Sequence, residues 1–367
     1  MNLFTRLFAM TVLTVVSLIE NPFLDGNAEA DTIGVSIPLS GDASELGQKF
    51  RSGVKLAIED LGSRHQLFIA DDGCDPDLAS LAASDLASQQ PAIVIGLLCN
   101  EPAKVVSNEL VGTKVPVIVA GARSVRLIKD REREDWNLWR MSPGDDYPVA
   151  VAAEAITNLW TKTPFAIVDD GTIYGRSFTD SLRAKLDERG MAPQFSDTFR
   201  AAQSTQAGLL RRLQRSGVTA AFIASATVED LFTIAKNMKE FDIKLDIMTT
   251  EALAVLPFLE EFEKTPPGVK VVMASTTGDA YLEERLTVLQ MERDREIYAG
   301  YAAVQVAIQA VGATPQDTTE ALATKEFNTV LGKLRFNADG SSTYNPYELR
   351  IWNGTKLVKP EIETETQ

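Results

Sequence analysis

Short apolar segments alternate with amphipathic segments of helical length along most of this chain, and this alternation constrains the fold more than any other feature. Two such sets occur, one over residues 32–120 and one over residues 150–274. Strands that alternate with helices of about 10–15 residues form right-handed βαβ units with parallel strands. The length of 367 residues also exceeds what one hydrophobic core usually holds. We therefore predict an α/β fold with two doubly wound parallel-sheet lobes. The predicted strands cover residues 32–38, 66–70, 92–98, 115–120, 165–168, 220–224, 245–248 and 269–274.

The alternation ends in the C-terminal part of the chain. The apolar spacing predicts a long helix over residues 296–312 and a short helix over 319–331. Two strands are predicted at 333–340 and 347–354, and residues 359–367 are predicted to be a flexible polar tail.

The N-terminus has the features of an export signal. Arg6 precedes an apolar run of 13 residues from Leu7 to Ile19, and Ala28-Glu29-Ala30 offers small residues for cleavage before Asp31. The apolar run is too short to span a bilayer comfortably. We predict a signal peptide over residues 1–30 and a periplasmic mature protein, with a buried N-terminal helix as the alternative.

The chain has two cysteines, and each lies just beyond a predicted strand. Cys74 follows the strand at 66–70, and Cys99 follows the strand at 92–98. In an exported protein, two cysteines at adjacent strand ends favour a disulfide. The alternative is two separate buried thiols, because free cysteine is often found in the core.

Charge and missing motifs exclude several classes of function. The net charge of −15 argues against nucleic acids and anionic lipid surfaces as partners. No dinucleotide-binding glycine motif, phosphate-binding lysine loop or nucleophile elbow is present, and His65 is the single histidine. The acidic pairs Asp71-Asp72 and Asp169-Asp170 follow apolar strands but have no obvious partner base. We therefore expect no enzyme, no cofactor and no metal site.

Five short motifs occur in an order that resembles a known family. They are Ile37-Pro-Leu-Ser-Gly41, Asp71-Asp-Gly-Cys-Asp-Pro76, Gly96-Leu-Leu-Cys99, Arg140-Met-Ser-Pro143 and Tyr174-Gly175. Behind a signal peptide, this series resembles the branched-chain amino acid binding proteins of ABC importers, which are type I periplasmic binding proteins. The resemblance extends over essentially all of the mature chain. That family places a disulfide where Cys74 and Cys99 stand.

The resemblance implies two lobes joined by three hinge crossings. The crossings are expected near residues 142–144, 275–278 and 336–340. The first lobe would then comprise residues 31–142 and 276–336, and the second lobe residues 143–275 and 337–358. The ligand would lie between the lobes, at the carboxyl ends of the strands.

The resemblance also implies which residues bind the ligand. The first lobe would hold the carboxylate of an amino acid, and an acid of the second lobe would hold its ammonium group. By position, Glu251 is the expected ammonium partner and Tyr174 an aromatic wall, the alternatives being an exposed acid and a helix-edge packing residue. The complete expected set is Asn100, Gly121, Ala122, Arg123, Ser124, Tyr174, Thr227 and Glu251.

Several of these positions depart from the family pattern. The family commonly has serine where this chain has Asn100, and it has alanine and threonine in the segment that contains Arg123. A guanidinium in the cleft would bind a carboxylate with two parallel hydrogen bonds and would favour a more anionic ligand. Alternatively, Arg123 points outward with Arg126 and Lys129. The sequence therefore leaves open whether the ligand is an amino acid, branched-chain amino acids included, or a related organic acid.

The expected function is that of a periplasmic solute-binding protein. It would act as a monomer, capture a small polar ligand and deliver it to an ABC permease in the inner membrane. A ligand sensor of the same fold that signals to a receptor is the first alternative, and a secreted hydrolase is the second. A DNA-binding regulator is disfavoured because an export signal stands where its DNA-binding domain would be.

Overall fold

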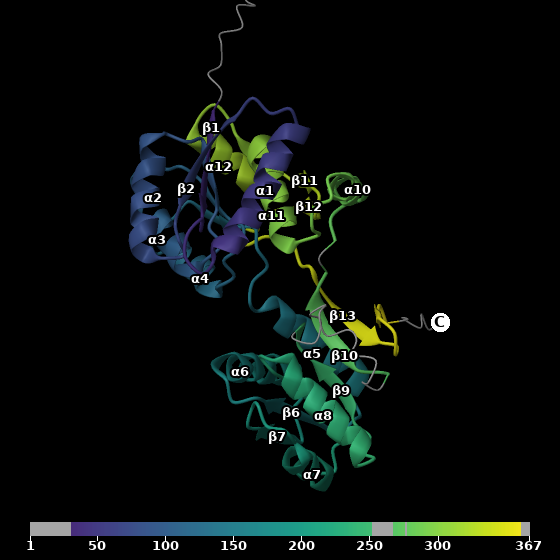
Figure 1. Cartoon of the computed structure of the whole chain (residues 1–367). Coiled ribbons are helices and arrows are strands. Elements are labelled where there is room, and N and C mark those ends of the chain that lie inside the picture. The colour runs from purple at the N-terminus through teal and green to yellow at the C-terminus, as the bar shows by residue number, and fades with distance from the viewer. Residues whose placement is uncertain (1–30, 252–266, 276, 361–367) are drawn as a thin grey trace, which may run out of the picture.

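The computed structural model describes residues 31–251, 267–275 and 277–360. The chain forms two lobes, each built around its own sheet (Figure 1). The predicted signal peptide and most of the predicted tail lie outside the described residues.

The first lobe has a parallel sheet whose strand order is β2-β1-β3-β4-β5. The order reverses direction between β1 and β3, so the loops at the carboxyl ends of these strands open a crevice suited to a ligand. Its strands are β1 (Thr32–Ile37), β2 (Gln66–Asp71), β3 (Ile93–Gly96), β4 (Val117–Val119) and β5 (Leu138–Arg140). The helices that alternate with them are α1 (Ser44–Asp60), α2 (Pro76–Ser88), α3 (Asn100–Leu110), which continues into the short 3-10 turn η1 (Val111–Thr113), and α4 (Val125–Arg131).

The second lobe repeats this strand order, with β7-β6-β8-β9-β10 in the same relative positions. The predicted α/β fold with two doubly wound lobes is confirmed. The second sheet is not fully parallel, because β13 pairs antiparallel with β10 and β14 pairs antiparallel with β13. Its strands are β6 (Phe165–Asp169), β7 (Phe195–Thr198), β8 (Ala220–Ala224), β9 (Asp246–Thr249), β10 (Lys270–Ala274), β13 (Tyr347–Trp352) and β14 (Leu357–Val358). Its helices are α5 (Tyr147–Trp160), α6 (Ile173–Asp187), α7 (Ala207–Arg215) and α8 (Val228–Glu240).

After β10 the chain returns to the first lobe. Helices α10 (Ala280–Val288), α11 (Arg295–Ala310) and α12 (Pro315–Thr324) contribute side chains to the core of that lobe, followed by the hairpin β11 (Phe327–Thr329) and β12 (Gly332–Leu334). The predicted helix over 319–331 is therefore wrong beyond Thr324. The chain becomes extended at Lys325, and Phe327 is buried against the first-lobe core, so packing overrides the local helical pattern.

Within the described residues the chain passes between the lobes three times, after β5, after β10 and before β13. The segment Asn337–Ser342 lies against β5, where the Arg140 N–H donates to the Gly340 carbonyl at 2.8 Å and Arg140 forms a bridge with Ser341. We therefore propose that the third crossing begins after Ser342 rather than at residue 336.

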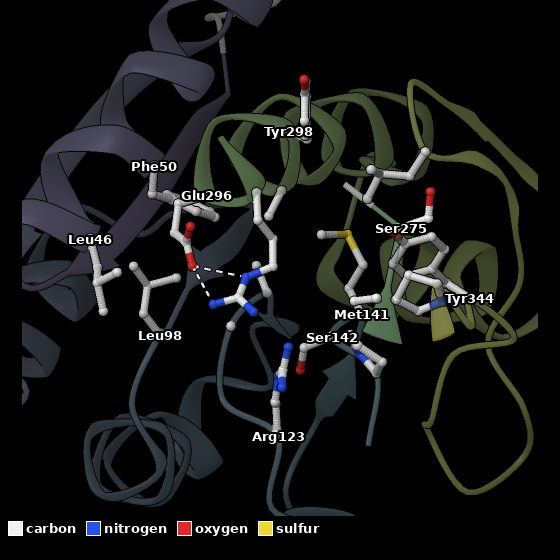
Figure 2. Close-up of a pocket in the computed structure, with 18 residues that line it drawn as sticks. Leu46, Phe50, Leu98, Arg123, Met141, Ser142, Ser275, Glu296, Tyr298 and Tyr344 are labelled. Atoms are coloured by element: carbon white, nitrogen blue, oxygen red, sulfur yellow. Dashed lines mark hydrogen bonds and ion pairs between the residues drawn. The ribbon is translucent and has the colours of Figure 1, made fainter. Parts of the chain in front are cut away.

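Helices α1 and α11 lie side by side in the first lobe (Figure 1) and approach closely through two glycines. A Cβ atom at Gly300 would lie 2.3 Å from the Phe50 carbonyl oxygen, and one at Gly53 would lie 2.1 Å from the Ile297 carbonyl oxygen. Only glycine permits this approach. The contact sets Phe50 of α1 and Tyr298 of α11 around the same space at the edge of the lobe (Figure 2).

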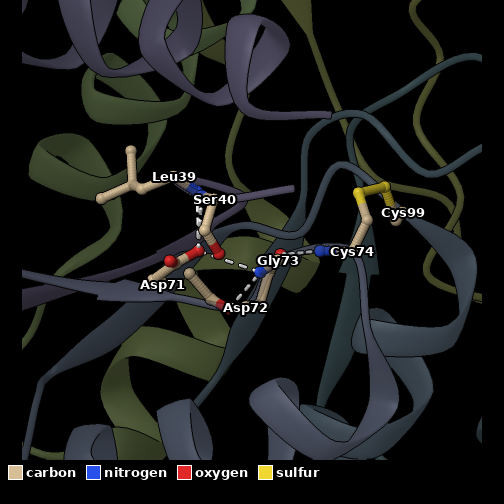
Figure 3. The surroundings of a disulfide bond; sticks show 8 residues. Leu39, Ser40, Asp71, Asp72, Gly73, Cys74 and Cys99 are labelled. Atoms are coloured by element: carbon tan, nitrogen blue, oxygen red, sulfur yellow. Dashed lines mark hydrogen bonds between the residues drawn. A yellow bond between two sulfur atoms is a disulfide. The ribbon is translucent and has the colours of Figure 1, made fainter. Parts of the chain in front are cut away.

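The acidic pairs at the ends of β2 and β6 hold the loops that follow. Asp71 accepts hydrogen bonds from the Leu39, Ser40 and Gly73 N–H groups at 2.6, 3.2 and 3.0 Å (Figure 3). Burial alone would raise the pKa of Asp71, but these hydrogen bonds outweigh it and hold the pKa below its usual value. In the second lobe, Asp170 accepts from the Ala226 N–H at 2.7 Å and so joins the loops after β6 and β8.

The two cysteines form a disulfide, as predicted. Cys74 and Cys99 are bonded, with 5.5 Å between their Cα atoms, and they tie the loop after β2 to the start of α3 (Figure 3). The Cys74 N–H donates to Asp72 Oδ1 at 3.0 Å, so the disulfide and the acidic pair hold the same loop.

None of the helices in the described part of the chain combines the length and apolar character needed to cross a membrane.

The close contact between α1 and α11 predicts that Gly300→Ala lowers the free energy of unfolding by about 1–3 kcal/mol, because a backbone must move to admit the methyl group. Urea denaturation followed by circular dichroism measures this change. Gly112→Ala is the matched control, since no atom lies within 4 Å of its added Cβ atom. Equal stability of the two variants would contradict the packing argument.

The hydrogen bonds to Asp71 predict that Asp71→Asn destabilises the protein by about 1–3 kcal/mol at neutral pH. A carboxyl group with a lowered folded-state pKa stabilises the fold above its unfolded pKa and loses that effect as the pH falls through the folded value. The difference between wild type and variant should therefore be largest near pH 7 and shrink below about pH 4. Thermal unfolding across this range measures it, and Asp85→Asn, at an exposed position of α2, is the control. A difference that stays constant with pH would contradict the assignment.

Candidate ligand-binding cleft

A cavity of about 300 Å³ lies where the first lobe meets all three crossings (Figure 2). The first crossing contributes Ser142 and Pro143, the second Ser275, and the third Tyr344 and Pro346. A ligand here therefore touches the segments whose backbone must rotate when the lobes move.

Most of the cavity wall is apolar. Leu46 and Phe50 project from α1, and Met141 lies at the end of β5 (Figure 2). Tyr298 of α11 is 1% exposed, and its hydroxyl donates to Glu283 at 2.7 Å. Burial raises the pKa of Tyr344 to about 12, so this phenol is neutral at physiological pH. The wall therefore suits a ligand with an apolar body.

The charged groups that line the cavity, among the described residues, are Arg123, Arg295 and Glu296. Arg295 and Glu296 are neighbours in the first turn of α11, and the Arg295 guanidinium donates to Glu296 Oε1 from Nη2 at 2.9 Å and from Nε at 3.1 Å. Burial, together with the neighbouring Asp294, raises the pKa of Glu296, and Arg295 opposes this shift. Glu296 is therefore an acid whose charge is already compensated by the protein.

Arg123 enters the cleft from the loop after β4, so the alternative in which it points outward with Arg126 and Lys129 is not what the structure shows. Its Nη1 lies 3.7 Å from Glu251 Oε1, and its guanidinium carbon lies 5.7 Å from the centre of the Tyr347 ring. Both partners belong to the second lobe. No described residue accepts a hydrogen bond from the Arg123 guanidinium, and Figure 2 shows this group pointing into the cavity.

The backbone of the Arg123 loop is held by residues at the start of the first crossing. The Arg140 side chain is 3% exposed and donates from Nη1 to the Arg123 and Ser124 carbonyls at 3.2 and 3.0 Å. Burial lowers the pKa of Arg140. The Ser142 hydroxyl donates to the Ala122 carbonyl. The loop that carries Arg123 is thus tied to the segment that turns toward the second lobe.

The first-lobe residues expected from the sequence fall into two groups. Gly121 and Arg123 line the cavity. Ala122 is buried beneath the loop. The Ser124 N–H donates to Asn100 Oδ1 at 3.2 Å, and the Ser124 hydroxyl accepts a hydrogen bond from the Arg126 N–H. Asn100, Ala122 and Ser124 therefore shape the loop and do not line the cavity.

The second-lobe residues are more widely spread. Glu251 reaches Arg123, as described. Tyr174 is 43% exposed and lines a separate, wider space of about 900 Å³ together with Arg140 and Asp145. Thr227 is exposed and donates to Asp230 Oδ2 at 2.9 Å, and it lines neither space.

Sequence reasoning missed the contributions of α1 and α11 to the cleft. From the sequence, four cavity-lining residues were predicted only to lie in helices or at helix ends: Leu46, Phe50, Arg295 and Glu296. The hydrophobic spacing of a helix indicates which face is buried, but it does not indicate that the first turn of the helix faces a cleft.

Comparison with known proteins agrees with this architecture. A family model described as periplasmic binding protein matches residues 32–356. Among relatives, Leu/Ile/Val-binding protein homolog 2 of Brucella abortus (strain 2308) is 23% identical over 353 residues, which cover 90% of this chain and 92% of the relative.

Two solved structures illustrate the structural likeness. A putative branched-chain amino acid ABC transporter from Rhodospirillum rubrum aligns with a TM-score of 0.76 at 17% identity, over 90% of this chain and 100% of that chain. A solute-binding protein of an ABC transporter from Rhodopseudomonas palustris HaA2, in complex with p-hydroxybenzoic acid, aligns with a TM-score of 0.65 at 15% identity, over 92% of this chain and 100% of that chain. At these identities the likeness shows the fold. The family match spans nearly all of the described residues, and on this ground the chain belongs to the periplasmic binding protein family.

Proposed function

We propose that this protein is a periplasmic solute-binding protein of an ABC importer, which captures a small carboxylate-bearing ligand between its lobes and delivers it to a permease. The observation that carries the proposal is the Arg123 guanidinium, which points into the cavity and makes no hydrogen bond to any described residue. Arg123 is half-buried, and a carboxylate ligand would supply two hydrogen-bond acceptors to its planar guanidinium.

The position of the cavity supports a mechanism of lobe closure. Arg123 belongs to the first lobe, whereas Glu251 and Tyr347, which lie next to its guanidinium, belong to the second. A ligand that contacts both lobes stabilises the closed arrangement relative to the open one, and the permease then recognises the closed form. Binding without turnover is sufficient for this role.

The size and walls of the cavity limit the ligand. A cavity of about 300 Å³ lies at the lower end of the range for small-molecule sites. Relatives carry names or titles that refer to leucine, isoleucine and valine or to p-hydroxybenzoic acid. The class proposed for this chain is therefore an amino acid or an organic acid of similar size.

We further propose that residues 1–30 direct export of the protein and that it acts as a monomer. The apolar run and the Ala28-Glu29-Ala30 segment support export, and the family match supports a periplasmic location.

The proposal predicts that one chemical class of small acids raises the thermal unfolding midpoint of the exported protein. Amino acids, monocarboxylic acids, dicarboxylic acids, amides and sugars form the screen. A ligand that binds only the folded state raises stability in proportion to the logarithm of its concentration above its Kd. Isothermal titration then measures a stoichiometry of one ligand per chain. No shift and no heat of binding with any class would contradict the proposed function.

A further inference from the structure

Building on the proposed function, we propose that the ligand is a monocarboxylic acid with an apolar body and without an α-ammonium group. Four observations support this choice: the charge of the cavity lining, the cationic partners of the nearby acids, the hydrogen-bond donors of Arg123, and the apolar wall.

The charge of the cavity lining favours a single anion. Two guanidinium groups, Arg123 and Arg295, line it together with one carboxylate, Glu296, among the residues that the structure describes. The lining residues are therefore net positive, and Glu251, 3.7 Å from Arg123 but outside the lining, offsets part of this charge. A monocarboxylate adds the anion that the two lining guanidinium groups favour, whereas a zwitterion brings them no net negative charge.

The acids near the cavity already have cationic partners. Glu296 accepts two hydrogen bonds from Arg295, so its charge already has a cationic partner. Glu251, expected from the sequence to bind an ammonium group, has its carboxylate beside Arg123 and does not line the cavity. An ammonium group would have to break one of these pairs to find an acid.

Arg123 lies within ion-pair distance of Glu251, but its guanidinium donates no hydrogen bond to a described residue. Its described partners are Glu251 at 3.7 Å, beyond hydrogen-bond distance, and the ring of Tyr347 at 5.7 Å. A guanidinium has five N–H donors in a planar fork that matches the two oxygens of a carboxylate. The geometry therefore makes Arg123 the group that binds the ligand carboxylate.

The rest of the ligand meets few polar groups. The Ser142 hydroxyl is used by the Ala122 carbonyl, and the Ser275 hydroxyl lies 3.4 Å from the Thr277 hydroxyl. Phe50 and Met141 supply apolar surface to the same cavity (Figure 2). A hydrocarbon or aromatic body gains from burial here, while additional charged groups would be desolvated without partners.

The test compares acids that differ only in the α-amino group. Isothermal titration of the wild-type protein uses 4-methylpentanoate against leucine and 3-phenylpropanoate against phenylalanine. We expect at least one acid to bind about tenfold or more tightly than its amino-acid partner, and 4-methylpentanamide to lose about tenfold or more relative to 4-methylpentanoate.

Two cleft variants and one control identify the groups responsible. Arg123→Met should weaken binding of the acid about tenfold or more, whereas Arg126→Met, at an exposed position of α4 that does not line the cavity, should leave it unchanged. Glu251→Gln should leave affinity for the acid unchanged or increase it severalfold, because it removes a negative charge that competes for Arg123. A ligand ammonium bound by Glu251 would instead lose roughly 10- to 100-fold in this variant. Circular dichroism confirms that each variant is folded.

The outcomes separate this inference from the proposed function. If neither acid binds about tenfold or more tightly than its amino-acid partner, if Glu251→Gln weakens binding, or if the screen finds only a dicarboxylate or an uncharged ligand, the inference is overturned and the protein remains a solute-binding protein. If no compound of any class binds, the proposed function fails and the inference fails with it.

Discussion

Hydrogen bonds from loop N–H groups to aspartate carboxylates hold loops at the carboxyl ends of both sheets, the edges at which the two lobes face each other. Asp71 and Asp72 organise the loops beside β2, and Asp169 and Asp170 do the same beside β6. The loops between parallel strands and helices have few backbone partners of their own, so a carboxylate that accepts several N–H groups gives them a defined shape. The same strand order in both lobes places these acidic pairs at equivalent positions.

Binding and lobe movement are linked through the loop that carries Arg123. Its backbone is held by Arg140 and Ser142, which also begin the first crossing, while its guanidinium lies next to Glu251 and Tyr347 of the second lobe. A ligand carboxylate on Arg123 therefore acts on the same short segment that absorbs rotation between the lobes. In the proposed function, this arrangement would give the ligand different contacts in the open and closed forms, which is the requirement for a population shift.

The elements with strong patterns were predictable, and the errors occur where packing decides. The strands β1, β6 and β8 are almost wholly buried, so their apolar runs are clear in the sequence. The edge strand β7 alternates half-buried and exposed residues, and β5 has three residues, so neither gave a signal. The spacing of Phe327 fits a helix, but this residue begins strand β11 and fills the first-lobe core.

The sequence by itself determined the two-lobed α/β architecture, because hydrophobic periodicity is a local property of the chain, and it favoured a disulfide between Cys74 and Cys99. It also named Arg123 and Glu251 as candidates. Only the tertiary structure decided that Arg123 points into the cavity, that Glu251 lies beside it, and that Arg295 of α11 lines the same space. These placements depend on the close contact between α1 and α11 and on the crossings between lobes, which bring together residues more than a hundred positions apart.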